Sequence, residues 1–226
     1  MTQLAKFIGR YQVLDLGVES AIRHHVFGGF WFAVCLFVFW VNSERPGGQS
    51  VRERVLVTLF GATLAILLAR LCGLAISWAP PSRDPILAHL YPTYLMENIN
   101  DNSFPSESTA LYAAIAAGIW SLNRLIGAIL FVLVVVVVSL PRVFVGGHYP
   151  TDIFAGLILG LVAYFLVDAF PHAWFRRLSE KVFQQASWLR ILGEFVVFVW
   201  ISQIAVEFAE FVWVKNALAR ILKGGW

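Results

Sequence analysis

Long apolar stretches alternate with short polar segments along most of this chain. Each apolar stretch has the composition of a helix that crosses, or nearly crosses, the hydrocarbon core of a bilayer. The third stretch is short and rich in alanine and glycine, and the sixth contains three glutamates. The pattern predicts an all-α, polytopic membrane helical bundle with about six spans, at residues 26–41, 55–78, 109–120, 125–140, 153–167 and 191–214.

The polar segments between these stretches predict the remaining elements. Residues 1–25 mix apolar and charged side chains and are too polar to span, so we expect an amphipathic helix that lies at the membrane interface. A loop is expected at residues 42–53 and a basic amphipathic connection at residues 172–190. The longest polar connection covers residues 79–108, and a loop of that length in a compact membrane protein is usually functional. We expect a single membrane-embedded domain over residues 1–226.

The composition agrees with a membrane protein. Of the 226 residues, 59% are hydrophobic and 14% are charged, against about a quarter charged in soluble domains, and the mean hydropathy is +0.72. The net charge of +3 is small and the basic residues are spread over the expected helix ends, which favours a bilayer and not a nucleic acid as partner. Cys35 and Cys72 lie inside apolar stretches and form no zinc or disulfide pattern. No carboxylate cluster predicts a metal, and no cofactor is implied.

The turn between the fourth and fifth stretches carries the polar side chains Arg142, His148 and Asp152. Such groups are costly at a helix junction in a membrane, so they indicate a function. A histidine can act as a nucleophile or a base, a carboxylate four residues later can hold one of its ring nitrogens, and an arginine fork suits phosphate oxygens. The alternative is a polar interhelical turn with a structural histidine. The combination of the three groups favours the functional interpretation.

The spacing Arg142-x5-His148-x3-Asp152 resembles the third signature of the type 2 phosphatidic acid phosphatase superfamily, whose membrane branch removes phosphate from lipids. The residue before the arginine is Pro141, where the family usually has serine. The resemblance implies that His148 is the nucleophile that takes the phosphoryl group and that Asp152 orients and charges it. It also implies that Arg142 binds phosphate.

The segment from Ser103 to Thr109 resembles the family's second signature, Pro-Ser-x-His. By that resemblance, Ser106 is the phosphate-binding serine. Ser106 also opens a predicted helix, so its hydroxyl and the amides of Glu107 and Ser108 are placed to hold an anion at the positive helix end. The alternative is a plain helix cap followed by an acidic residue.

The second signature departs from the family at Ser108, which stands where the family has the histidine that protonates the leaving oxygen. A serine is no proton donor near neutral pH. An alkoxide leaving group needs a proton because its conjugate acid has a pKa of about 15, whereas a phosphate leaving group, with a second pKa of about 6, does not. We therefore expect cleavage of a lipid diphosphate in preference to a phosphate monoester, unless another acid such as His89 or Glu107 substitutes.

The first signature, usually Lys-x6-Arg-Pro, is degraded. Its nearest match is Arg83, with Asp84 inserted before the proline and no lysine seven residues upstream. Arg70, inside the second stretch, is the other candidate phosphate ligand, because an arginine within a span costs about 3 kcal/mol unless it snorkels or finds a partner. The alternative is that Arg70 pairs with Asp168 or Glu194.

Successive spans alternate in direction, so the long loop at residues 79–108 and the turn at His148 are expected on the same side of the membrane. The opposite side carries eight basic residues, and this side carries six once Arg83 and Arg142 are set aside as phosphate ligands. The bias favours a bacterial inner-membrane protein whose site faces the periplasm.

The flanking residues Ser-Phe-Pro-Ser and Val-Gly-Gly-His-Tyr-Pro-Thr-Asp look closest to bacterial undecaprenyl-diphosphate phosphatases of this superfamily. The resemblance implies a phosphohistidine mechanism without metal or cofactor, acting on a lipid phosphate or diphosphate, with a polyprenyl diphosphate favoured. The residues leave open a phosphatidate, phosphatidylglycerophosphate or lipid A phosphatase. They also leave open a non-catalytic relative that binds or transports a phospholipid.

Overall fold

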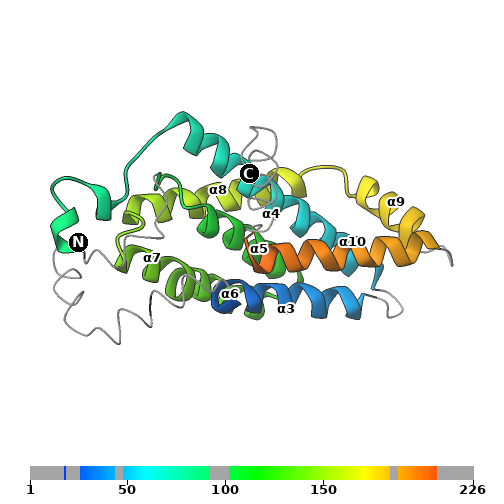
Figure 1. The fold of residues 1–226 in the computed structure, drawn as a ribbon. Helices are drawn as coiled ribbons and strands as arrows, with labels where there is room; N and C mark the ends of the chain where they lie inside the picture. The colour runs from blue at the N-terminus through cyan, green and yellow to red at the C-terminus, as the bar shows by residue number, and fades with distance from the viewer. Residues whose placement is uncertain (1–17, 19–25, 44–47, 92–101, 184–187, 208–226) are drawn as a thin grey trace, which may run out of the picture.

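The computed structural model describes residues 18, 26–43, 48–91, 102–183 and 188–207, and every regular element in these ranges is helical (Figure 1). The expected all-α fold is therefore confirmed. The elements are α3 (Val26–Asn42), α4 (Gln49–Ala75), the 3-10 turns η1 (Pro81–Arg83) and η2 (Ala88–Leu90), α5 (Glu107–Leu122), α6 (Arg124–Leu133), the π-helical η4 (Val134–Ser139), α7 (Leu140–Phe144), α8 (Pro150–Asp168), α9 (His172–Phe183) and α10 (Trp188–Ala205).

Four helical segments among the described residues are long and apolar enough to cross a membrane. They are α4, the continuous α6–η4–α7 segment, α8 and α10. The helices at the first and third predicted spans are shorter, because the apolar part of α3 runs from Gly28 to Asn42 and α5 has 16 residues. The count of six spans therefore stays a prediction. The expected interfacial helix at residues 1–25 lies outside the described residues, apart from Val18.

Several helix boundaries differ from the sequence-based expectation, among them those of α4 and α10. α4 begins at Gln49, inside the expected loop at residues 42–53, because its basic first turns find acidic partners on other helices. α4 ends at Ala75 instead of residue 78, since the chain becomes extended at the next position. α10 ends at Ala205, short of the expected residue 214, and the positions from 208 onward lie outside the described residues.

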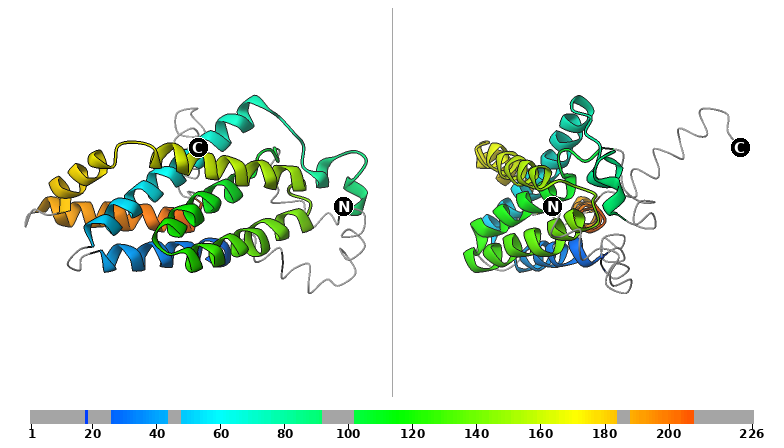
Figure 2. Two further views of the ribbon diagram at one scale, coloured as in Figure 1. Left: turned by 180° about the vertical axis from the view of Figure 1, so that it is seen from behind. Right: turned by 90° about the vertical axis from the view of Figure 1, so that its left-hand side faces the viewer.

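α5 lies in the middle of the bundle, packed between α4 and α8 (Figure 1, Figure 2). Its residues from position 108 to 119 are all buried. The contact with α8 is nearly backbone to backbone: a Cβ added at Gly156 would lie 2.7 Å from the Ser106 carbonyl oxygen, and one at Gly160 would lie 2.2 Å from that of Ala110. Two small residues one helical turn apart thus bring the first turns of α8 directly against those of α5.

The fourth apolar stretch is one continuous helix, but its centre is not α-helical. The run of valines forms η4, where the amide of Leu140 donates to the carbonyl of Val135. Pro141 accounts for the irregularity, because it has no N–H to donate to the preceding turn and its ring crowds the carbonyl four residues earlier. π-Helical turns are often found at functional sites. Here the turn supplies the Ser139 hydroxyl and the Val138 carbonyl to the polar cluster described below.

Ion pairs join the helices near the start of α4, at the end of the bundle away from the His148 turn. Arg54 donates to Asp168 at 2.8 Å, and the guanidinium of Arg52 lies 3.6 Å from the carboxylate of Glu194. This overturns the alternative in which one of these two acids pairs with Arg70. Arg70 lies about 24 Å further along α4 than Arg54, at about 1.5 Å per residue. The expected basic connection after α8 forms the helix α9, which packs against α4.

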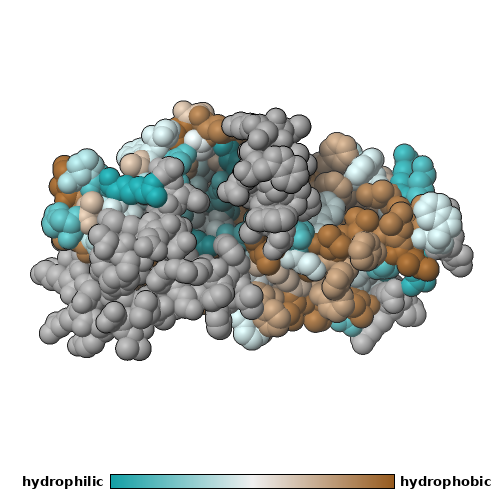
Figure 3. All heavy atoms as spheres, viewed as in Figure 1, coloured by the Kyte–Doolittle hydropathy of each residue, from teal (hydrophilic) through white to brown (hydrophobic). Residues whose placement is uncertain are grey.

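Large apolar side chains cover much of the outer surface, and Figure 3 shows them gathered over α3 and α10. Phe30 and Phe37 on α3 and Phe195 and Phe198 on α10 are each about half exposed or more. A surface of this kind on helices that satisfy their own backbone groups suits a hydrocarbon solvent and not water. The chain is an integral membrane protein.

Candidate active site

The long loop and the turn before α8 meet at one end of the bundle, as the alternation of spans predicts (Figure 1). The amide of Ser82 donates to the carbonyl of Gly146 at 3.0 Å. At the start of α5, the amide of Ser106 donates to the carbonyl of Asp152 at 3.2 Å. The segments of the first and second signatures therefore both contact the segment of the third, although up to about 70 residues of chain separate them.

The ring of His148 is held by a backbone carbonyl. Its Nδ1 lies 2.7 Å from the carbonyl oxygen of Ser103, in the loop before α5. A carbonyl oxygen can only accept, so Nδ1 carries the hydrogen and the neutral ring has its lone pair on Nε2. The backbone around the ring is fixed as well, because the amides of Gly147 and His148 both donate to the carbonyl of Arg142. This tautomer is the one required for nucleophilic attack through Nε2.

Asp152 is buried, with 1% of its side chain exposed, and it caps α8. Its Oδ2 accepts a hydrogen bond from the amide of Tyr149 at 2.8 Å. The distance from the same oxygen to Nδ1 of His148 is 3.8 Å, which is too long for a hydrogen bond. The sequence predicts that Asp152 holds a ring nitrogen of His148. In the structure the Ser103 carbonyl accepts the hydrogen bond from Nδ1 instead. The carboxylate is still close enough to stabilise positive charge on the ring.

Arg142 is nearly buried and has two partners. Its Nη1 donates to the Val138 carbonyl at 2.7 Å, and its Nη2 donates to Oε1 of Glu207 at 2.8 Å. The exposed fractions of the Arg142 and Glu207 side chains are 11% and 15%. The second oxygen of the carboxylate, Oε2, accepts a short hydrogen bond from the hydroxyl of Ser108. Arg142 and the residue at the family's histidine position therefore share one carboxylate.

Glu207 is the site residue that the sequence analysis missed. It follows the end of α10 and is one of three glutamates in the sixth apolar stretch. The signal was present, since an ionisable residue within an otherwise apolar segment of a membrane protein marks a candidate functional site. No spacing rule connects Glu207 with Arg142, however, because 65 positions separate them.

The hydroxyl of Ser106 belongs to a buried chain of three hydroxyls. It lies 2.8 Å from the hydroxyl of Thr109, which in turn lies 3.0 Å from that of Ser139 on η4. The Ser106 side chain makes no capping hydrogen bond to the backbone, so the plain helix cap is not what forms here. Next to it, the carboxylate of Glu107 accepts from Nε of Arg70 at 3.1 Å, with both side chains well exposed.

The segment of the first signature lies against the His148 turn. Asp84, the inserted residue, accepts a hydrogen bond from the hydroxyl of Tyr149 at 3.1 Å. Arg83 stands at the end of η1 with an exposed side chain, and His89 is exposed on η2. Arg83 therefore lies beside the His148 turn, because the residues on either side of it, Ser82 and Asp84, both contact that turn. His89 lies further along the loop.

Hydrogen bonding and burial shift two ionisable groups in this loop. Partial burial, and then the hydrogen bond to Asp84, raise the pKa of Tyr149 to about 12. The backbone amide of Ile86 is the main cause that lowers the pKa of Asp84, with the tyrosine hydroxyl contributing as well. At neutral pH the tyrosine therefore stays a donor and the carboxylate an acceptor.

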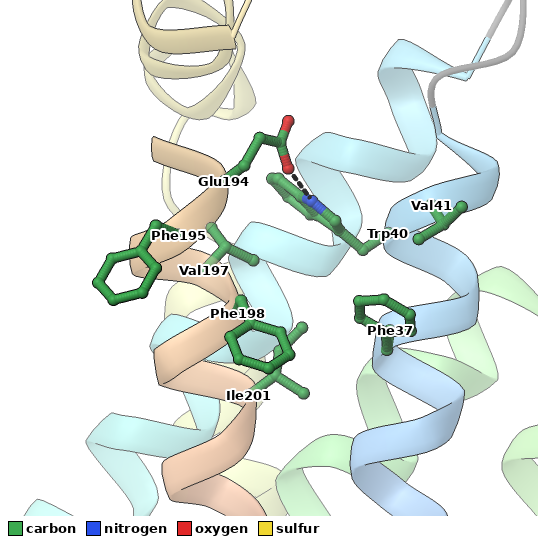
Figure 4. Close-up of a pocket in the computed structure, with 8 residues that line it drawn as sticks. All are labelled: Phe37, Trp40, Val41, Glu194, Phe195, Val197, Phe198 and Ile201. Atoms are coloured by element: carbon green, nitrogen blue, oxygen red, sulfur yellow. Dashed lines mark hydrogen bonds between the residues drawn. The ribbon is translucent and has the colours of Figure 1, made fainter. Parts of the chain in front are cut away.

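A separate cavity of about 350 Å³ lies between α3 and α10, as Figure 4 shows. Its walls are apolar except where the indole of Trp40 donates to Glu194 at 2.5 Å. Glu194 is roughly 20 Å along α10 from Glu207, at about 1.5 Å per residue, so this cavity does not belong to the polar cluster. Within the described ranges, no three His, Cys, Asp or Glu side chains group closely enough to hold a metal ion.

Comparison with known proteins identifies the family of this chain. The model of a family described as the PAP2 superfamily matches residues 75–176. The undecaprenyl-diphosphatase BcrC of Bacillus subtilis (strain 168) is 35% identical over 139 residues, which cover 62% of this chain and 67% of the relative. The chain belongs to the PAP2 superfamily.

Two further relatives of this PAP2 protein share lower identity. The bacitracin transport permease protein BcrC of Bacillus licheniformis is 28% identical over 155 residues, covering 66% of this chain and 72% of the relative. The putative undecaprenyl-diphosphatase YbjG of Escherichia coli (strain K12) is 27% identical over 157 residues, covering 61% and 72%. No solved structure matches significantly. The superfamily makes this chain a phosphatase of the type 2 phosphatidic acid phosphatase kind, and Arg70 and Glu207 lie outside the matched residues.

Proposed function

We propose that this phosphatase hydrolyses the terminal phosphate of a lipid diphosphate, with a polyprenyl diphosphate favoured, through a phosphohistidine at His148. One observation carries the proposal: the Ser103 carbonyl holds Nδ1 at 2.7 Å, so the nucleophilic lone pair is on Nε2. The ring also lies 3.8 Å from the buried carboxylate of Asp152 and in the same turn as the nearly buried Arg142, and ionisable groups gathered in this way in a membrane protein indicate a functional site.

The reaction runs in two balanced steps. Nε2 of His148 attacks the terminal phosphorus in line, an N–P bond forms, and the P–O bond to the lipid phosphate breaks with its electron pair leaving on that oxygen. Water then attacks the same phosphorus, the N–P electron pair returns to Nε2, and a proton of the water goes to solvent. Asp152 stabilises the positive charge on the ring in both steps.

Arginine and amide donors hold the phosphoryl group during these steps. Arg142 supplies the N–H groups that Val138 and Glu207 do not use, and the first-turn amides of α5 supply the positive end of a helix. Arg83 and Arg70 are proposed as outer phosphate ligands at the mouth of the site. The Ser106 hydroxyl, buried in its chain with Thr109, fixes the start of α5 beneath the anion.

The diphosphate preference rests on Ser108. No imidazole stands at that position, and the hydroxyl donates to Glu207 instead of facing a leaving oxygen as an acid would. A leaving lipid phosphate is stable without a proton, whereas a leaving alkoxide is not. Two of the relatives are named undecaprenyl-diphosphatases, which supports the same substrate class here. The site is proposed to face the periplasm, on the side of the membrane that carries fewer basic residues.

The test is phosphate release from a panel of a polyprenyl diphosphate, phosphatidate, phosphatidylglycerophosphate and lipid A. We expect release from the diphosphate to be the fastest, and His148→Ala to abolish it in protein that still folds and inserts. His172→Ala is the matched control, because His172 lies at the other end of α8, 3.7 Å from Asp168, and should leave turnover unchanged. Turnover retained by His148→Ala, or faster release from phosphatidate, contradicts the proposal.

A further inference from the structure

The phosphate-binding arginine and the substituted second signature meet on a single carboxylate. Oε1 of Glu207 takes the Nη2 hydrogen of Arg142 at 2.8 Å, and Oε2 takes the hydroxyl hydrogen of Ser108. Both members of the ion pair are nearly buried. A charge-assisted hydrogen bond with this little water around it is directional, so the carboxylate and the Val138 carbonyl together restrict the orientation of the guanidinium fork.

The end of α10 that carries Glu207 is itself held by two other helices. The hydroxyl of the buried Tyr112 on α5 donates to the carbonyl of Ile204 at 3.2 Å. On α3, Gly29 packs so closely that an added Cβ would lie 2.1 Å from the carbonyl oxygen of Ala205. Contacts with α5 and α3 thus fix the helix end that carries the carboxylate.

The backbone at Glu207 is unusual. Its φ is 54°, the left-handed region that residues with a side chain seldom adopt, and its amide donates to the carbonyl of Ile204 at 3.1 Å. Residues in such conformations persist where surrounding contacts hold them, and they are frequent at functional sites. The conformation turns the chain at the helix end, where the side chain reaches Arg142 and Ser108.

We propose that Glu207 is a positioning residue of the phosphate site. Its carboxylate holds the Arg142 fork and the hydroxyl of Ser108, the residue that stands where the second signature has histidine, in one geometry. This inference rests on the proposed function, because it takes Arg142 as a phosphate ligand. Two N–H groups of the guanidinium are committed to Val138 and Glu207, and the others remain for phosphate. A fork fixed in advance needs no reordering as charge builds on the phosphoryl oxygens.

The first test compares Glu207, which follows the end of α10, with Glu194, which lies within that helix. Glu207→Gln keeps the size of the side chain but removes the charge that orients Arg142, so we expect kcat/KM to fall roughly 10- to 100-fold, mostly through kcat, as for loss of a hydrogen bond between charged groups. Glu194→Gln is the matched control, because Glu194 also faces an arginine, Arg52, but at the opposite end of the bundle. That variant should keep kcat/KM within about twofold of the wild type.

The second test asks whether Glu207 acts through Arg142. Introducing Glu207→Gln into an Arg142→Gln background should cause no further loss of kcat/KM, because the group being positioned is already gone. A merely structural ion pair predicts that Glu207→Gln lowers the melting temperature, as Glu194→Gln does, without a selective loss of kcat. Additive losses overturn the proposal, as does wild-type kcat/KM in Glu207→Gln.

Vanadate binding provides a readout that needs no turnover. Vanadate adopts the geometry of the phosphoryl transition state, so the rise in melting temperature that it causes reports on the arrangement of the anion donors. We expect a smaller rise in Glu207→Gln than in the wild type and an unchanged rise in Glu194→Gln. An equal rise in all three proteins contradicts the role of Glu207. Failure of the histidine mechanism shows separately, as turnover that survives in His148→Ala.

Discussion

A backbone carbonyl and a carboxylate both lie near Nδ1 of His148, and they have different tasks. The Ser103 carbonyl, at 2.7 Å, fixes the tautomer, whereas Asp152, at 3.8 Å, supplies negative charge and caps α8. The third signature in the sequence identified His148 and Asp152 as the ionisable residues of this turn. It did not identify the carbonyl, because every residue has one and no pattern marks which is close in space.

Asp152→Asn separates the two tasks of the carboxylate. The amide oxygen of asparagine can still accept from the amide of Tyr149, so the cap and the thermal stability should be retained. The positive charge on the ring loses its counter-charge, and kcat should fall about 10- to 100-fold. Steady-state kinetics and thermal unfolding in detergent check both halves. An unchanged kcat, or a loss that follows the melting temperature, contradicts this division of roles.

Helix α8 brings the His148 turn to the start of α5 because two glycines allow the two helices to approach closely. Gly156 and Gly160 lie against the carbonyls of Ser106 and Ala110, which leaves no room for a side chain. Alternating apolar and polar stretches predicted the helices themselves. They did not predict η4, because valines favour no particular helix type and only Pro141 gives a local reason for the wider turn.

Gly160→Ala tests this packing. The added methyl carbon would lie 2.2 Å from the Ala110 carbonyl oxygen, so α8 must move away from α5, and we expect a loss of about 1–3 kcal/mol in unfolding free energy together with lower activity. Gly28→Ala on α3 is the control, because its Cβ would meet Val138 at an ordinary 3.7 Å and alanine is the better helix former. Thermal unfolding in detergent compares them. Equal stability of both variants with the wild type contradicts the close contact.

At the scale of the whole molecule, the site is assembled from the ends of helices that run in opposite directions. The alternation of spans predicted that the long loop and the His148 turn share one end, and the contacts of Ser82 and Ser103 confirm it. The sequence did not predict that α10 closes the cluster through Glu207. That contact depends on where the sixth helix ends, and a pattern of hydrophobic residues locates helix ends poorly.

The central claim is a covalent phosphohistidine at residue 148, and trapping it tests that claim most directly. The wild-type protein is mixed with polyprenyl diphosphate labelled in the terminal phosphate, quenched in alkali, digested, and its phosphopeptides are mapped by mass spectrometry. The account predicts acid-labile label on the peptide that contains His148, and none in His148→Ala. Release of labelled phosphate without any labelled peptide, or label on a different residue, would contradict it.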